Sequence, residues 1–219
     1  MTRLLTLVAG LCAAVLFTAC AKPTYTFVTN SDDHVYFKVP AGWSEIKQRD
    51  LDKFASPGLD EASAAALRAQ TWTIAFDAGD KPSIAHVFSP KVEAPVVFAR
   101  VLRSGTADST TVSLDALRDF FLPVTKAARE TARATGQGLP GFRSVVDHVM
   151  TREGGLTGVH EVFRYKVSGV MQTFDQTAFV TKDASRVYIL LVRCTQACYA
   201  DRHGELATVV RSFIVKSGP

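Results

Sequence analysis

The stretch at residues 187–192 constrains the fold most, because all six of its residues are apolar. Successive side chains of a strand point to opposite faces of its sheet, so this strand must be covered on both faces. We therefore predict a central strand at this position. Runs rich in β-branched and aromatic residues predict further strands at residues 25–28, 35–39, 72–76, 84–88, 96–102, 144–151, 159–167 and 172–180.

Helices are predicted in two regions between these strands. Residues 44–70 look helical in two pieces divided at Pro57-Gly58, with Asp60 as the N-cap of the second piece. Residues 113–128 carry apolar side chains at spacings of three and four, which indicates an amphipathic helix. Pro123 lies inside that pattern and should kink the helix or end its first segment.

A last helix is expected at about residues 199–213. Because short turns join most of the strands, the sheet should be largely antiparallel. Its central strand is apolar on both faces, so helices should cover both sides. We expect an α+β protein, an α-β-α sandwich with a largely antiparallel central sheet covered by helices on both faces.

Composition is that of one ordinary globular domain. The chain has 219 residues, 47% of them hydrophobic, and a formal net charge of +4. A chain of this length buries most of the apolar surface that it exposes when unfolded. The charges are mixed along the sequence without a block of like sign. Nucleic-acid binding needs a clustered basic face, so no nucleic-acid partner is expected.

The N-terminus has the pattern of an export signal. Arg3 is followed by an uncharged apolar run at residues 4–17. The run ends at a lipobox-like Thr-Ala before Cys20, although Phe17 stands where that motif usually has Leu. One alternative is ordinary cleavage after Ala19-Cys20-Ala21, which also satisfies the small-x-small rule. The other is an uncleaved membrane helix, but the run is shorter than the length of about 20 residues that a spanning helix needs. A lipoprotein signal is favoured, because it alone explains the cysteine.

These observations predict the organisation of the chain. Residues 1–19 form a lipoprotein signal peptide, residues 20–24 a tether lipidated at Cys20, and residues 25–216 a single domain. Removing the signal leaves 200 residues and lowers the net charge to +3. We expect the protein outside the cytoplasm, held at the bacterial cell membrane by its lipid.

The two remaining cysteines are expected to pair. Export favours a disulfide between Cys194 and Cys198. Two free thiols are one alternative, and a metal site completed by His203 is another. A structural zinc site requires four ligands, so we expect no metal. We expect no cofactor either.

Three sequence patterns suggest catalysis without fulfilling its requirements. The glycine-rich segment at residues 136–141 has the spacing of a nucleotide loop, but a predicted helix precedes it and a predicted strand follows it. His160 and Glu161 lack the second histidine of a zinc protease. Ser144, Asp147 and His148 crowd one predicted strand, where Asp147 should face away from the other two. No catalytic residue is assigned.

Both ends of the predicted domain resemble those of a known family. An alternating strand that runs into Pro-x-Gly-Trp at residues 35–43 resembles the opening of PsbP-like domains. The apolar strand, the short Cys194–Cys198 link and a helix closing on Val-Val-Arg-Ser-Phe resemble their ending. Together with the signal, the chain is similar to the LpqN-type lipoproteins of actinobacteria over about residues 25–215. The resemblance implies an α-β-α sandwich at the cell envelope and brings no catalytic residues.

Two functions follow from these expectations. The leading hypothesis is a lipid-anchored, non-catalytic module that binds an envelope protein, a glycan or an apolar ligand. The alternative is a hydrolase of envelope lipids or glycans whose site forms only in three dimensions, and its first candidates are Ser144, Asp147, His148, His160 and Glu161. Large aromatic residues that belong either to the core or to a ligand site are Trp43, Trp72, Phe120, Phe121 and Phe213.

Overall fold

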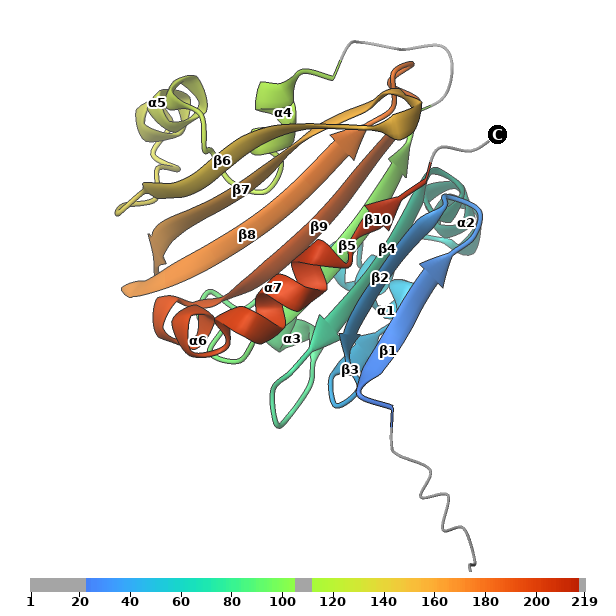
Figure 1. Cartoon of the computed structure of the whole chain (residues 1–219), viewed down its shortest axis with the longest axis horizontal. Helices are drawn as coiled ribbons and strands as arrows, with labels where there is room; N and C mark the ends of the chain where they lie inside the picture. The colour runs from blue at the N-terminus through green and yellow to red at the C-terminus, as the bar shows by residue number, and fades with distance from the viewer. Residues whose placement is uncertain (1–22, 105–111, 217–219) are drawn as a thin grey trace, which may run out of the picture.

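A seven-stranded antiparallel sheet forms the centre of the molecule (Figure 1), as seen in a computed structural model that describes residues 23–104 and 112–216. Its strand order is β3-β4-β5-β9-β8-β7-β6. The strands are β3 (Ser44–Ile46), β4 (Thr71–Asp77), β5 (Val96–Arg103), β6 (Arg143–Arg152), β7 (Leu156–Val167), β8 (Val170–Val180) and β9 (Arg186–Thr195). The predicted central strand is β9, which has three strands on either side, so that prediction is confirmed.

A smaller sheet joins the two ends of the described chain. It consists of β1 (Tyr25–Asn30), β2 (Val35–Pro40) and β10 (Ile214–Val215), with β2 in the middle. Val28 pairs with Phe37 across β1 and β2, and both side chains are buried. The alternation of β2 therefore gives this small sheet one face that belongs to the core and one that does not.

Helices and the small sheet cover the main sheet from both sides. Neighbouring residues of β8 show the two layers, because Gln176 donates to the carbonyl of Leu117 on one face while Asp175 accepts from Tyr199 on the other. The first face carries α1 (Gln48–Ala55), α2 (Glu61–Gln70), α3 (Ile84–Val87), α4 (Leu114–Arg118) and α5 (Lys126–Ala134). The second face carries the small sheet, α6 (Gln196–Asp201) and α7 (His203–Arg211) (Figure 1).

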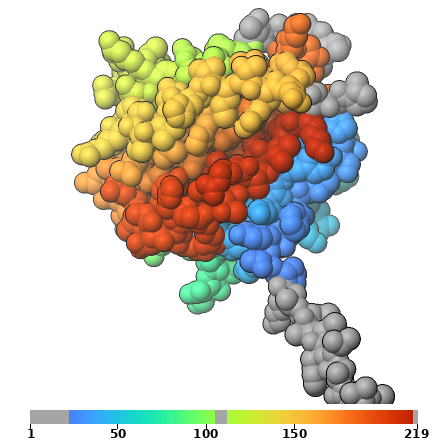
Figure 2. Space-filling view, viewed as in Figure 1, coloured from blue at the N-terminus to red at the C-terminus, as the bar shows by residue number. Residues whose placement is uncertain are grey.

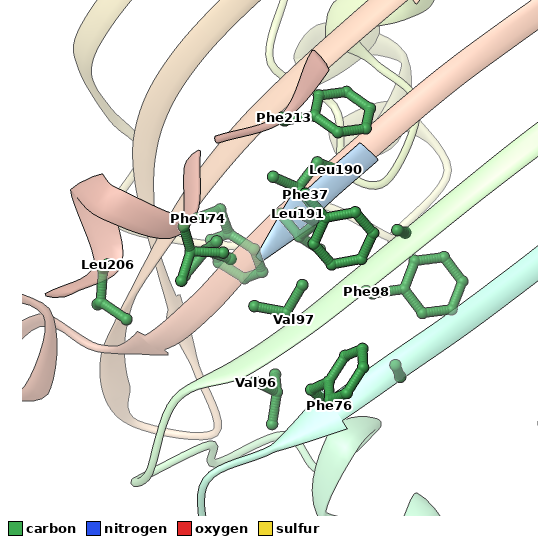
Figure 3. Packing of buried hydrophobic residues seen from close by; sticks show 14 of the residues in the cluster. Phe37, Phe76, Val96, Val97, Phe98, Phe174, Leu190, Leu191, Leu206 and Phe213 are labelled. Carbon is green, nitrogen blue, oxygen red and sulfur yellow. The ribbon is translucent and has the colours of Figure 1, made fainter. Parts of the chain in front are cut away.

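Aromatic side chains fill the space between the two sheets (Figure 3). The ring of Phe37 meets those of Phe76 and Phe213 edge to face, with ring centroids 6.3 and 6.4 Å apart. Phe179 continues this cluster against Phe213. Trp43 and Phe213 are buried, and Trp72, Phe120 and Phe121 pack partly buried against the core. These five aromatic residues therefore belong to the core.

A buried ion pair also ties the small sheet to the main one. Asp33, in the turn between β1 and β2, is 1% exposed. Its carboxylate accepts hydrogen bonds from Arg103 Nε at 2.8 Å and from Asn30 Nδ2 at 2.7 Å. Arg103 also donates to the carbonyl of Ala69 at the end of α2. One arginine thus joins the hairpin turn, β5 and α2, as a planar guanidinium with several donors can.

Several predicted elements differ from those observed. Residues 84–88 were expected as a strand, but Ile84–Val87 is a helical turn because Ser83 Oγ caps it by accepting from the amide of His86 at 3.1 Å. The helix expected at residues 113–128 is divided around Pro123, as that proline predicted, and Asp119 accepts from the amides of Val124 and Thr125 in the break. The second segment continues beyond the expected end, to Ala134.

Two further differences lie near the ends of the described chain. The expected last helix, at residues 199–213, is divided at Arg202 into α6 and α7 and is followed by β10. The expected helical region at residues 44–70 begins with β3 instead. It then forms two helices on either side of Pro57-Gly58, and Asp60 caps the second by accepting from the amide of Ser63 at 2.9 Å.

Candidate functional site

The residues proposed for a triad do not converge. Ser144, Asp147 and His148 all lie exposed on β6, at one edge of the main sheet. A bulge between Ser144 and Val146 shifts the register. Ser144 therefore shares a face with Asp147, not with His148 as the simple alternation predicted. Asp147 accepts from Arg118 of α4 at 2.9 Å and does not orient a histidine.

A histidine–aspartate pair lies on the other face of that sheet. His160 Nε2 is 2.9 Å from Asp175 Oδ1, and Tyr199 donates to Asp175 Oδ2 at 2.6 Å. Asp175 is 3% exposed, and burial together with this carboxylate raises the pKa of Tyr199 well above its usual value. Among the hydrogen bonds of the described residues, His160 has no serine, threonine or cysteine partner. The hydrogen bond from Tyr199 to Asp175 fastens α6 to the sheet.

Glu161 is buried on the face beneath α4. It is 1% exposed, and its Oε1 accepts from Gln176 Nε2 at 2.9 Å. Burial is the main cause that raises the pKa of Glu161 to about 8, and Asp147 adds to the effect. The two residues of the His160-Glu161 motif thus face opposite sides of β7, as strand alternation requires.

Cys194 and Cys198 form a disulfide, with Cα atoms 6.0 Å apart. His203 packs its ring against Tyr199, with centroids 5.9 Å apart. In the described ranges, no group of three or more His, Cys, Asp or Glu side chains is arranged to hold a metal ion. The proposed lipidation residue, Cys20, lies outside the described residues.

A pocket lies between α1 and α2. Its volume of about 390 Å³ is large enough for a small ligand. The turn at Pro57-Gly58 brings the two helices together, and Gly58 permits it by adopting a φ of +86°. The lining residues come from both helices and the link between them: Arg49, Asp52, Lys53, Ser56, Gly58, Leu59, Glu61, Ala64 and Arg68.

Asp52 is the unusual member of this pocket. It is 8% exposed, and its Oδ2 atom is buried without a hydrogen-bond partner. Burial raises the pKa of Asp52, while the charges of Arg68 and Arg100 oppose the shift. A buried acceptor that lacks a partner costs free energy. A ligand that donates a hydrogen bond to Asp52 would recover that cost.

Cationic side chains line the same pocket as this carboxylate. Arg49 and Lys53 are exposed and lie four residues apart, on the same side of α1. Arg68 of α2 extends to Glu61, with Nη2 2.6 Å from Oε1. Glu61 is strongly exposed, so this ion pair is weak and can open for a ligand. Leu59 and Ala64 form an apolar part of the pocket wall. The pocket can therefore hold an anion that also carries a hydroxyl group and some apolar surface.

Sequence reasoning missed this pocket. The two helices and their turn were expected, and so was the N-cap Asp60 of the second helix. The burial of Asp52 was not, because an acidic residue in a short, charged helix normally faces solvent. One signal was present: Asp52 is next to Leu51, the apolar residue with which α1 contacts the core.

A second hollow, of about 530 Å³, lies beside the β8–β9 turn. Lys182, Arg186 and Lys216 line it, and Asp33 lies 3.5 Å from Arg186. It is more open than the α1–α2 pocket and has no unpaired buried carboxylate among its lining residues. We therefore take the α1–α2 pocket as the candidate site.

No helix in the described parts of the chain is long and apolar enough to cross a membrane.

Comparison with known proteins identifies the fold. No family model matches the chain, and no curated protein matches its sequence. The structure is similar to that of the PsbP protein CyanoP from Synechocystis, with a TM-score of 0.51 and 15% identity over 90% of this chain and 96% of that chain. The chain therefore has a PsbP-like fold, as its sequence predicted.

Two other solved structures superpose less well. LpqN of Mycobacterium tuberculosis, described as involved in cell envelope biogenesis, gives a TM-score of 0.44 and 14% identity over 88% of this chain and 91% of that one. A protein of unknown function from Pseudomonas aeruginosa gives 0.42 and 13% over 90% of this chain and 100% of that one.

Proposed function

We propose that this protein is a lipid-anchored binding module of the bacterial envelope, which holds an anionic, hydroxyl-bearing ligand in the α1–α2 pocket. Phosphorylated or carboxylated glycans belong to that ligand class. The observation that carries the proposal is the buried, unpaired Oδ2 of Asp52 among cationic side chains. A site built only for surface charge would not bury a carboxylate.

The chemistry of the lining residues specifies this ligand class. A sugar hydroxyl can donate to Asp52, whose oxygen otherwise lacks a partner. A phosphate or carboxylate can accept hydrogen bonds from Arg49 and Lys53 at the mouth of the pocket. The apolar face of a sugar ring can pack on Leu59, which is 43% exposed. The export signal predicted from the sequence favours a ligand found in the envelope.

Binding of a hexose 6-phosphate tests the proposal. We expect it to shift the amide NMR signals of residues 49–68, and to do so more strongly than the free hexose or inorganic phosphate, because only the phosphorylated sugar reaches both Asp52 and the cations. Asp52→Asn and Lys53→Gln should each weaken binding about tenfold, which corresponds to the loss of one hydrogen bond to a charged group.

A matched control is Lys126→Gln, which removes an exposed lysine of α5 and should leave binding unchanged. The same cooperative unfolding in all the variants would show that they fold alike. Equal affinity in the wild type, Asp52→Asn and Lys53→Gln would overturn the proposed site.

A further inference from the structure

The outer face of the small sheet is apolar and aromatic, although none of the helices and strands of residues 23–104 and 112–216 covers it. The inner side chains of β1 and β2, such as Val28 and Phe37, are buried in the core. The alternate residues point outward, and Phe27 is 76% exposed while Ile214 of β10 is 49% exposed. Tyr25 and Tyr36 lie on the same side. The surfaces of soluble proteins rarely carry a cluster of such side chains that has no binding partner.

Lysines accompany these aromatic rings. Lys38 Nζ lies 4.3 Å from the ring centroid of Tyr25, and Lys216 Nζ lies 5.1 Å from that of Tyr36. None of the strands β1, β2 and β10 contains an acidic residue. The face is therefore positive as well as aromatic, a combination typical of surfaces that rest in the headgroup region of a membrane.

The position of this face relative to the N-terminus indicates its partner. We propose that the outer face of the β1-β2-β10 sheet rests on anionic lipid headgroups and orients the domain on the membrane. The inference builds on the proposed anchoring at Cys20, which lies five residues before Tyr25. Five residues span at most roughly 18 Å, so an acylated Cys20 would keep β1 beside the bilayer.

Each component of the face has a defined part in docking. The rings of Tyr25 and Tyr36 suit the interface, where amphipathic aromatic side chains concentrate. Phe27 and Ile214 would enter the acyl boundary. Lys38 and Lys216 would meet anionic headgroups, each strengthening the association about fivefold. In Figures 1 and 2, the blue N-terminal strands and the red C-terminal segment form one continuous side of the molecule.

Tryptophan quenching by spin-labelled lipids tests this docking. The full chain, purified in detergent from the whole lysate of its host, would carry Phe27→Trp or, as a matched control, Val149→Trp. Val149 is 56% exposed on the distant edge strand β6. The signal of the parent protein, which contains Trp43 and Trp72, is subtracted. In vesicles of phosphatidylcholine and phosphatidylglycerol, we expect quenching several-fold stronger at position 27 than at position 149.

Lipid composition and charge give the second arm. In the Phe27→Trp protein, Lys38→Gln with Lys216→Gln should lower quenching to the level seen in vesicles of phosphatidylcholine alone. Equal quenching at positions 27 and 149 would overturn the proposal. Quenching at position 27 that is the same with and without phosphatidylglycerol would also overturn it. Self-association of the parent chain through this face, detected by ultracentrifugation and abolished by Phe27→Ser, would point to a second copy as the partner instead.

Failure of the anchoring is a separate result. The mass of the N-terminal peptide reports whether Cys20 is acylated, and the quenching is measured whether or not it is. An unacylated Phe27→Trp chain whose introduced tryptophan is quenched retains the inference about this face while refuting the lipid anchor. An acylated Phe27→Trp chain whose introduced tryptophan stays unquenched retains the anchor and refutes the face.

Discussion

Glu161 couples the stability of the protein to pH. Its pKa of about 8 in the folded protein lies above the value of an exposed glutamate, chiefly because burial disfavours the charged form. The folded state thus keeps a proton that the unfolded state has lost. Stability from this group is fully present below the unfolded pKa and is lost as pH rises toward 8.

Glu161→Gln should remove that dependence. Between about pH 5 and pH 8, the free energy of unfolding of the wild type should fall relative to the variant by roughly 1.4 kcal/mol per pH unit. Urea unfolding of both proteins across this range measures the difference, and titrating groups that they share cancel. Parallel stability curves would contradict the raised pKa.

The sequence identifies the titratable residues, but it does not predict which of them are buried or what packs against them. The strand expected at residues 159–167 places His160 and Glu161 on opposite faces, since that depends only on strand geometry. Which of the two is buried depends on α4, a distant segment whose docking no local pattern specifies. The same limit applies to the burial of Asp52. The bulge beside Ser144 adds one residue to β6, and this reverses the face on which Ser144 was expected.

At the scale of elements, the Cys194–Cys198 disulfide fixes the junction between β9 and α6. Cys194 lies fully buried one residue before the end of β9, and the amide of Cys198 donates to the N-cap Thr195 at 3.2 Å. A bridge across so short a loop contributes about 2 kcal/mol by chain entropy. The core, rather than the bridge, should therefore hold the fold.

Replacing both cysteines by alanine tests that division. Cys194→Ala with Cys198→Ala should lower the free energy of unfolding by about 2 kcal/mol from lost chain entropy, with somewhat more from the buried sulfur, and leave the circular dichroism spectrum unchanged. Thiol labelling of the native wild type without reductant should find neither cysteine reactive. Loss of cooperative unfolding in the variant, or full labelling of the wild type, would contradict this account.

Long, strongly patterned elements were predicted well, and short ones were not. Residues 187–192 predicted a strand that is covered on both faces, because every position is apolar. The helical turn at residues 84–87 looks like a strand, since its apolar residues are few and its cap depends on Ser83. The two-residue β10 has no pattern of its own and forms only because β2 offers a free edge.

On the scale of the whole molecule, the two proposed surfaces occupy opposite layers. The small sheet covers one face of the main sheet, whereas α1 and α2 cover the other, so a domain that rests on its β1-β2-β10 face would direct the α1–α2 pocket away from the membrane (Figure 1). That arrangement suits an anchored module that meets an envelope ligand. It depends on the tether before Tyr25 being attached to lipid.

Replacing the proposed lipidation residue tests the attachment. Cys20→Ala removes the thiol that would carry diacylglycerol, so the variant should be released from the membrane or remain unprocessed, because acyl chains supply the apolar surface that holds such a protein in the bilayer. Cys12→Ala is the matched control, since it removes a thiol from the apolar run. Membrane fractionation with radiolabelled palmitate should show label and membrane association in the wild type and Cys12→Ala only. Normal processing and unchanged fractionation of Cys20→Ala would leave the chain without a lipid anchor, and the docking face would then have to hold the domain alone.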